Sequence, residues 1–175
     1  MKPRALASLA MIALSLAGCT VGVGTPAHTM GVIKLGVDLP LSGDDAPDGL
    51  PAKNAIDLAI KQAGRVCGPT RHPDACFDLQ AITYDDVSQG IHDPAKGAKN
   101  VQLLVEDARV LAMIGPIYDS LARSELPVAN PVQLAMVSPG TTNECLTQEP
   151  ADGHCQGLSG HLSGRCPLFC FLSGQ

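Results

Sequence analysis

The sequence is poor in aromatic residues and has no tryptophan: aromatic side chains make up 3% of its 175 residues. Apolar residues still account for 45% of the chain, so a hydrophobic core must be built from Ala, Val, Leu and Ile. Aliphatic side chains of this kind suit helices that lie on a parallel sheet. The length favours a single domain.

Clusters of basic residues are also absent, and the formal net charge is -5. A nucleic-acid partner needs such clusters to neutralise phosphates, so we expect none. The chain has no G-x-S-x-G motif, and neither a histidine nor a third acid lies at metal-ligand spacing from the carboxylate pair Asp85 and Asp86. We therefore expect no enzyme activity, no metal site and no cofactor, with an α/β hydrolase as the weaker alternative.

An export signal is present at the start of the chain. Lys2 and Arg4 precede an apolar run, Ala5 to Ala17, that is shorter than the roughly 20 residues of a membrane span. The run ends in Leu16-Ala17-Gly18-Cys19, which resembles the bacterial lipobox, where the cysteine thiol is alkylated with diacylglycerol. We predict a lipoprotein signal peptide at 1–18 and a protein anchored to the cell membrane through Cys19. The alternative is an ordinary signal peptide in which this cysteine has no role.

Seven cysteines are many for a chain of this length, and with an export signal they indicate an oxidising compartment. Cys67 and Cys76 have eight residues between them, in a segment rich in Gly and Pro, and we predict a disulfide between them rather than a zinc site. Four more cysteines lie near the end of the chain: Cys145, Cys155, Cys166 and Cys170. Their pairing stays open, with Cys145–Cys155 as one candidate.

Short apolar runs alternate with helical patterns through the middle of the chain. Strands are expected at 32–39, 77–84, 110–114 and 134–137, and helices at 52–63, 94–105 and 120–129. Gly64 ends the first helix, and Asp93-Pro94 begins the second. This alternation predicts an α/β fold, a doubly wound parallel sheet with helices on both faces.

The two ends of the chain differ from this middle part. Residues 19–30 show neither a helical nor a strand period and are predicted to form a flexible tether. Residues 31–150 carry the predicted lobe, which is incomplete because a fifth helix and strand do not appear. Residues 151–175 are rich in Gly and show no period. We expect an irregular tail there, for which a change of reading frame near residue 150 is one explanation.

The ends of three predicted strands, 32–39, 110–114 and 134–137, are candidates for a ligand site. Ligands of open parallel sheets bind at the carboxyl ends of the strands. The first of them, with the strand before it, reads Ile33-Lys34-Leu35-Gly36-Val37 running into Pro40-Leu41-Ser42-Gly43. It resembles the start of type I periplasmic binding proteins, in particular the leucine/isoleucine/valine-binding branch that serves amino-acid ABC transporters. Later landmarks of that family follow in order: Asp85-Asp86 before Asp93-Pro94, Ile114-Gly115-Pro116, and Ser138-Pro139 followed by Thr142-Asn143. The resemblance covers about 32–147.

This resemblance implies two lobes that close on an amino acid and deliver it to an ABC-transporter permease. Carried over by position, the ligand-binding residues are Tyr118, Asp119, Ser120, Gly140, Thr141 and Thr142. The ligand carboxylate would meet the Gly140 N–H group and the Thr142 N–H and hydroxyl groups. Asp119 departs from the family, which usually places a small hydroxyl residue there, and its carboxylate would repel an α-carboxylate or accept an ammonium group.

Two alternatives apply to these loops. Without the resemblance, their residues would be read as ordinary turn and cap chemistry. The second alternative is that the chain is a non-functional remnant, because a single lobe leaves half of the polar groups of a ligand facing water. We therefore expect negligible affinity of the 175-residue chain for amino acids.

Overall fold

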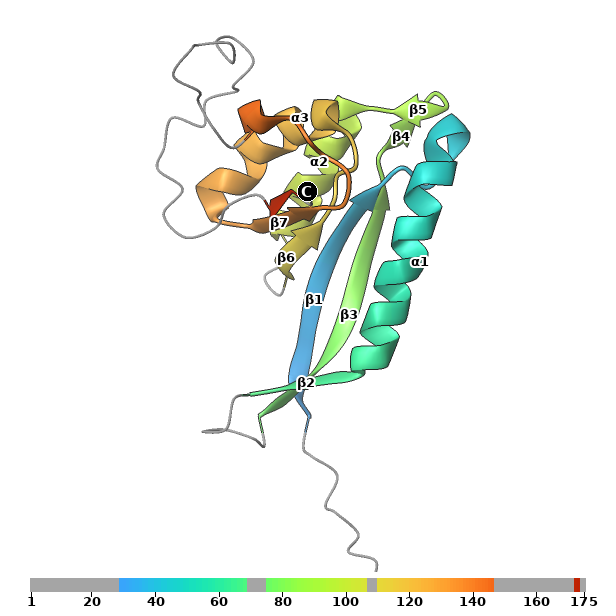
Figure 1. Ribbon diagram of the computed structural model, residues 1–175. Helices are drawn as coiled ribbons and strands as arrows, with labels where there is room; N and C mark the ends of the chain where they lie inside the picture. The colour runs from blue at the N-terminus through green and yellow to red at the C-terminus, as the bar shows by residue number, and fades with distance from the viewer. Residues whose placement is uncertain (1–28, 69–74, 107–109, 147–171, 174–175) are drawn as a thin grey trace, which may run out of the picture.

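The computed structural model describes residues 29–68, 75–106, 110–146 and 172–173, which form an α/β fold (Figure 1). A six-stranded sheet has the order β2-β3-β1-β6-β7-β8. Its strands are β1 (Thr29–Leu39), β2 (Arg65–Cys67), β3 (Cys76–Asp85), β6 (Val110–Ile114), β7 (Ala135–Ser138) and β8 (Leu172–Ser173). The helices are α1 (Ala46–Ala63), α2 (Pro94–Glu106) and α3 (Asp119–Ala129). A small hairpin, β4 (Val87–Ser88) with β5 (Ile91–His92), and three short 3-10 helices, Gly43–Asp45, Asn130–Val132 and Glu144–Leu146, complete the described elements.

Parallel pairing dominates the sheet. β1 pairs in parallel with β3 on one side and with β6 on the other, and β7 continues beside β6. α1 lies along β1 and β3 on one face, whereas α2 and α3 pack together on the other (Figure 1). The predicted doubly wound sheet with helices on both faces is confirmed. Among the described residues, no helix combines the length and the apolar character needed to cross a membrane.

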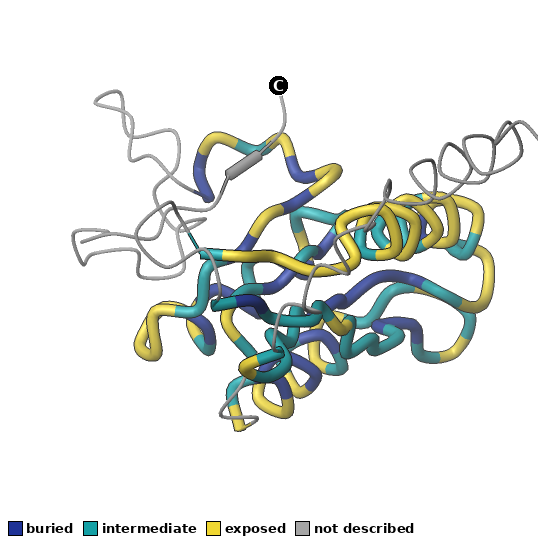
Figure 2. Tube along the Cα trace, turned by 90° about the horizontal axis from the view of Figure 1, so that it is seen from below, coloured by how far each residue is buried: buried dark blue, intermediate teal, exposed yellow. Residues whose placement is uncertain are grey.

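The core lies between the sheet and the α2–α3 layer. Met113 of β6 and Met136 of β7 are paired in register and pack with Val101 and Leu104 of α2. Each fully buried aliphatic side chain of this kind stabilises the fold by about 1.5–3 kcal/mol. α2 approaches β1 so closely that a Cβ atom on Gly36 would lie 2.7 Å from the Leu104 side chain. Buried stretches lie inside the fold and exposed stretches lie along its outside (Figure 2).

The helix ends follow from local chemistry. Asp93 accepts hydrogen bonds through Oδ1 from the N–H groups of Ala95 (2.8 Å) and Lys96 (3.4 Å), which confirms it as the cap of α2. Gly64 ends α1 with a positive φ of 57°. α1 begins at Ala46, earlier than the predicted residue 52. The first part of the helix was not predicted because its Pro and Gly residues are poor helix formers.

Four strand features were not predicted, and the first is the antiparallel hairpin of β4 and β5. β2 is antiparallel to β3, where a purely parallel sheet was expected. β1 begins at Thr29, inside the predicted tether. The expectation of no strand within 151–175 is wrong for two residues, because β8 pairs in parallel with Val137 and Ser138 at the free edge of β7. Short strands of this kind carry too few residues for a sequence period to appear.

Candidate ligand site at the carboxyl ends of the strands

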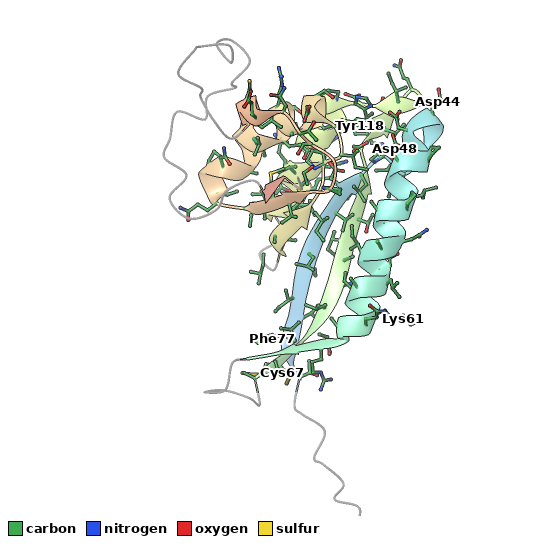
Figure 3. All side chains as sticks on the ribbon, viewed as in Figure 1. Asp44, Asp48, Lys61, Cys67, Phe77 and Tyr118 are labelled. Atoms are coloured by element: carbon green, nitrogen blue, oxygen red, sulfur yellow. A yellow bond between two sulfur atoms is a disulfide. The ribbon has the colours of Figure 1, made fainter. Side chains whose placement is uncertain are left out.

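The strand order places a topological switch point between β1 and β6. From β1 the chain crosses to β3 on one side of the sheet and then returns to β6 on the other. In open α/β sheets the carboxyl ends of the strands at such a point are where ligands bind. Asp44, Asp48 and Tyr118 lie together at this end, whereas Cys67 and Phe77 lie at the opposite end of the sheet (Figure 3).

Tyr118 links the loops that follow three of the strands. It precedes α3 in an extended conformation, and its hydroxyl group donates a hydrogen bond of 2.6 Å to Oδ2 of Asp48 in α1. Its ring stacks on that of His92, with 4.0 Å between the ring centroids. The His92 N–H group donates to Oδ2 of Asp45 (2.8 Å), and Nδ1 of its ring lies 2.7 Å from the same oxygen. Burial and the adjacent carboxylates raise the pKa of Tyr118, and the His92 N–H group and ring lower the pKa of Asp45.

Asp85 holds the loop after β1 in place. Its carboxylate accepts hydrogen bonds from the N–H groups of Leu41 (2.8 Å) and Val87 (3.2 Å) and from the hydroxyl group of Ser42 (2.6 Å). Burial acts to raise the pKa of Asp85, but these hydrogen bonds outweigh it and the pKa lies below its usual value. Asp85 therefore acts as a turn residue that ties the end of β3 to the loop after β1.

Ser138 joins the loop after β7 to the loop after β6. Its hydroxyl group donates to the carbonyl oxygen of Pro116 at 2.6 Å. The same Oγ atom accepts hydrogen bonds from the N–H groups of Gly140 (3.2 Å) and Thr141 (2.8 Å). A Cβ atom on Gly140 would lie 2.9 Å from the Ile117 side chain, so the close approach of the two loops favours glycine there.

Asp119 makes a second link between these loops. Its Oδ1 atom accepts hydrogen bonds from the N–H groups of Thr142 (3.1 Å) and Asn143 (3.4 Å). The structure therefore brings together the two segments that supply the six predicted ligand-binding residues. It places the Thr142 N–H group, predicted to meet a ligand carboxylate, against a carboxylate of the chain itself.

The six predicted residues differ in exposure. Ser120, Gly140 and Thr142 are exposed, and Tyr118 and Asp119 are half-buried. Thr141 is 1% exposed, and its hydroxyl group has no hydrogen-bond partner among the described residues. Five of the six are therefore at least partly accessible from the carboxyl end of the sheet.

A group of buried acids behind the loops was not predicted. Asp38 at the end of β1, Asp86 after β3 and Glu125 in α3 are all 0% exposed. Asn100 of α2 donates a hydrogen bond to Oδ1 of Asp38 (2.7 Å) and another to the carbonyl oxygen of Asp85 (3.1 Å). No donor group among the described residues reaches the second oxygen of Asp38 or the carboxyl oxygens of Asp86 and Glu125. Asp38 and Glu125 hydrogen-bond to one another, which requires one of the two to be protonated.

Burial raises the pKa of all three acids, because a charged carboxylate loses its hydration in the interior. The pKa of Asp38 is raised to about 8 and that of Asp86 to about 7. Glu125 has its pKa raised well above the usual value by burial and by the carboxylates of Asp38 and Asp86. Within the described residues, no group of three or more His, Cys, Asp or Glu is arranged to hold a metal ion.

The structure confirms the Cys67–Cys76 disulfide, which joins β2 to the start of β3 at the end of the sheet opposite Tyr118. Cys145 is also disulfide-bonded. Its suggested partner, Cys155, lies outside the described residues, as does the predicted lipidation site Cys19.

Comparison with solved structures shows what this fold is similar to. The leucine-binding protein LivK from Thermotoga maritima has 23% sequence identity and a TM-score of 0.56, over 66% of this chain and 30% of that chain. LivJ, the branched-chain amino acid transporter substrate-binding protein from Streptococcus pneumoniae, was solved with isoleucine and has 22% identity and a TM-score of 0.55, again over 66% and 30%. A solute-binding protein of an ABC transporter from Rhodopseudomonas palustris, solved with 3,4-dihydroxybenzoic acid, has 21% identity and a TM-score of 0.55, over 66% and 29%.

These similarities show the fold, that of a lobe of the type I periplasmic binding proteins, which the sequence predicted. The chain spans about 30% of the length of the structures that it matches. No protein-family model matches the sequence, and no curated protein matches it. The structural neighbours are substrate-binding proteins of ABC transporters, and their ligands include both amino acids and benzoates.

Proposed function

We propose that this chain forms one lobe of a substrate-binding protein of an ABC transporter and captures a small solute at the carboxyl ends of β1, β6 and β7. The observation that carries the proposal is the switch point between β1 and β6, where Tyr118 joins the loops after β1, β3 and β6. The ligand-binding residues are those predicted from the sequence, 118–120 and 140–142. The neighbours of similar fold support this class of function.

The cellular setting belongs to the same proposal. The protein is exported and lipid-anchored through Cys19, so that the lobe faces the periplasm or the outside of the cell and delivers its solute to a permease. A second lobe supplies the remaining ligand contacts. The lobe described here binds the solute only weakly on its own, because half of the polar groups of the ligand face water.

Weak binding can be measured by NMR titration of the 15N-labelled chain with leucine, 3-methylbutylamine and 3,4-dihydroxybenzoate. We expect at least one of these probes to shift the amide signals of 115–120 and 138–143 in a saturable manner. The amides of 65–67 and 76–79 at the opposite end of the sheet should stay in place. If no probe shifts the signals at the carboxyl ends of the strands, the chain is the non-functional remnant and the proposal is wrong.

Thr142 provides a residue-level test. Replacing it with alanine removes an exposed hydroxyl group from the loop after β7 and is expected to weaken binding by about 1–3 kcal/mol if the hydroxyl contacts a charged group of the solute. Thr29→Ala is the matched control, because Thr29 lies at the first residue of β1, far along the strand from this end. Equal affinities of the Thr142→Ala variant and the unmodified chain would remove Thr142 from the site.

A further inference from the structure

The loop after β7 has no free backbone donors between residues 140 and 143. Its four successive N–H groups all have acceptors within the chain. Oγ of Ser138 accepts the first two, those of Gly140 and Thr141. Oδ1 of Asp119 accepts the last two, those of Thr142 and Asn143.

A ligand carboxylate at this loop would need those donors, because backbone N–H groups at strand ends and helix starts are what hold an anion in such sites. The carboxylate of Asp119 already holds two of them. It also belongs to the first turn of α3, where its charge offsets the positive end of the helix dipole. A second carboxylate would therefore meet like charge and find its donors taken.

The rest of this end of the sheet presents acceptors for a cation. The Tyr118 hydroxyl group donates to Oδ2 of Asp48, Asp44 lies at the same end of the sheet (Figure 3), and the Tyr118 ring is stacked on His92. An aromatic face next to carboxylate oxygens attracts an ammonium group. The basic side chain of Lys96 pairs with a different acid, since its Nζ atom lies 3.8 Å from Oδ2 of Asp85 and donates to the Val87 carbonyl oxygen.

We infer that Asp119 takes the place of a ligand carboxylate and that the site selects an amine, a solute with a cationic group and no free carboxylate. This inference rests on the proposed function and names its substrate class. In the same site, an amino acid or an aromatic acid is the disfavoured ligand.

Three probes that share an isobutyl group separate the charges: 3-methylbutylamine carries only the ammonium group, 4-methylpentanoate only the carboxylate, and leucine both. In NMR titrations of the full chain, we expect the amine to bind about tenfold more tightly than the acid, because the acid makes one unfavourable charge contact that the amine does not make. The affinity for leucine should lie between the two. Binding of leucine or the acid as tight as that of the amine would overturn the inference and leave the proposed function standing. If none of the three shifts the amides of 115–120 and 138–143, the inference fails, and the proposed function then stands only if 3,4-dihydroxybenzoate shifts them.

Two variants of Asp119 then test whether this residue causes the preference for the amine over the acid. Asp119→Ser frees the two N–H groups and removes the charge, so the affinity for 4-methylpentanoate should rise about tenfold and that for the amine should fall. Asp119→Asn keeps an oxygen to accept the N–H groups, so it preserves the loop and still weakens amine binding. Asp78→Asn is the charge-matched control, because Asp78 pairs with Arg65 at the other end of the sheet. An unchanged preference in both Asp119 variants would contradict the assignment.

Discussion

Asn100 donates a hydrogen bond of 2.7 Å to Oδ1 of Asp38 and so ties α2 to the carboxyl end of β1. Both residues are buried, and 62 positions separate them in the sequence. A buried carboxyl oxygen that loses its donor keeps the full cost of its lost hydration. This pair therefore positions the loop that begins at Pro40, the first of those that form the candidate site.

Replacing Asn100 with valine is expected to lower the free energy of unfolding by about 1–3 kcal/mol, because Asp38 then lacks its donor. Urea denaturation monitored by circular dichroism measures the change. The double variant Asp38→Val/Asn100→Val removes both polar groups and should cost less than Asn100→Val alone. If the loss of unfolding free energy in the double variant equals the sum of the losses in the single variants Asp38→Val and Asn100→Val, the hydrogen bond has no role in stability.

The stability of the fold should decrease as the pH rises. Asp38 and Asp86 have pKa values of about 8 and about 7 in the folded chain, whereas an unfolded aspartate has a pKa of about 3.9. The unfolded chain therefore releases protons that the folded chain keeps, and stability falls from about pH 4 until both folded groups have ionised near pH 8. The lowered pKa values of Asp45 and Asp85 act in the opposite sense, but only below about pH 4.

Urea denaturation between pH 5 and pH 8 measures this dependence. Asp86→Asn should make the decrease with pH less steep, since the amide has no proton to lose while Asp38 and Glu125 still titrate, and Asp78→Asn should leave the curve unchanged. A stability that is constant or rises across this interval would show that the buried acids ionise as freely in the folded chain as in the unfolded one.

The Cys67–Cys76 disulfide should stabilise the edge of the sheet without affecting the candidate site. Closing so short a loop contributes roughly 2–3 kcal/mol, so the double variant with serine at both positions should unfold at a lower urea concentration. The amide signals of 115–120 should not move, because the bond lies at the opposite end of the sheet. Rapid alkylation of exported protein that finds both thiols free would contradict the bond itself.

Lipid attachment should depend on Cys19. With Cys19→Ser the thioether cannot form, so the protein should leave the membrane fraction of the cells that express it. Cys67→Ser is the matched control and should remain with the membrane. An absence of lipid on the unmodified protein by mass spectrometry, together with unchanged membrane retention of the Cys19→Ser variant, would refute the lipobox interpretation.

The regular part of the fold could be read from the sequence because its signals are local. The apolar run from Val110 to Ile114 is β6 in the structure, at the predicted residues. The start of α1 was missed because Gly49 and the adjacent prolines disfavour helix in isolation. In the fold, Gly49 is needed where α1 meets the end of β1, since a Cβ atom there would collide with the Pro40 carbonyl group.

The buried polar groups could not be read in the same way. Asp38 stands inside an apolar strand, and Glu125 lies among the buried residues Leu121, Ala122 and Leu126 of α3. An acid in an apolar run is a signal, but its partner Asn100 lies far away in sequence, and only the packing of α2 on β1 brings the two together. Asp119 was predicted to face the ligand, yet its bonds to the loop after β7 depend on how two distant loops meet.

The most direct test of a solute site at the switch point is where a bound solute lies. Isotope-filtered NOE spectra of the labelled chain with 3-methylbutylamine report which protein protons lie within about 5 Å of the solute methyl groups, a distance comparable to side-chain contact. We predict NOEs to the ring protons of Tyr118 and to the protons of 140–142. NOEs confined to Phe77 at the opposite end of the sheet, or to the exposed Leu58 of α1, would contradict it.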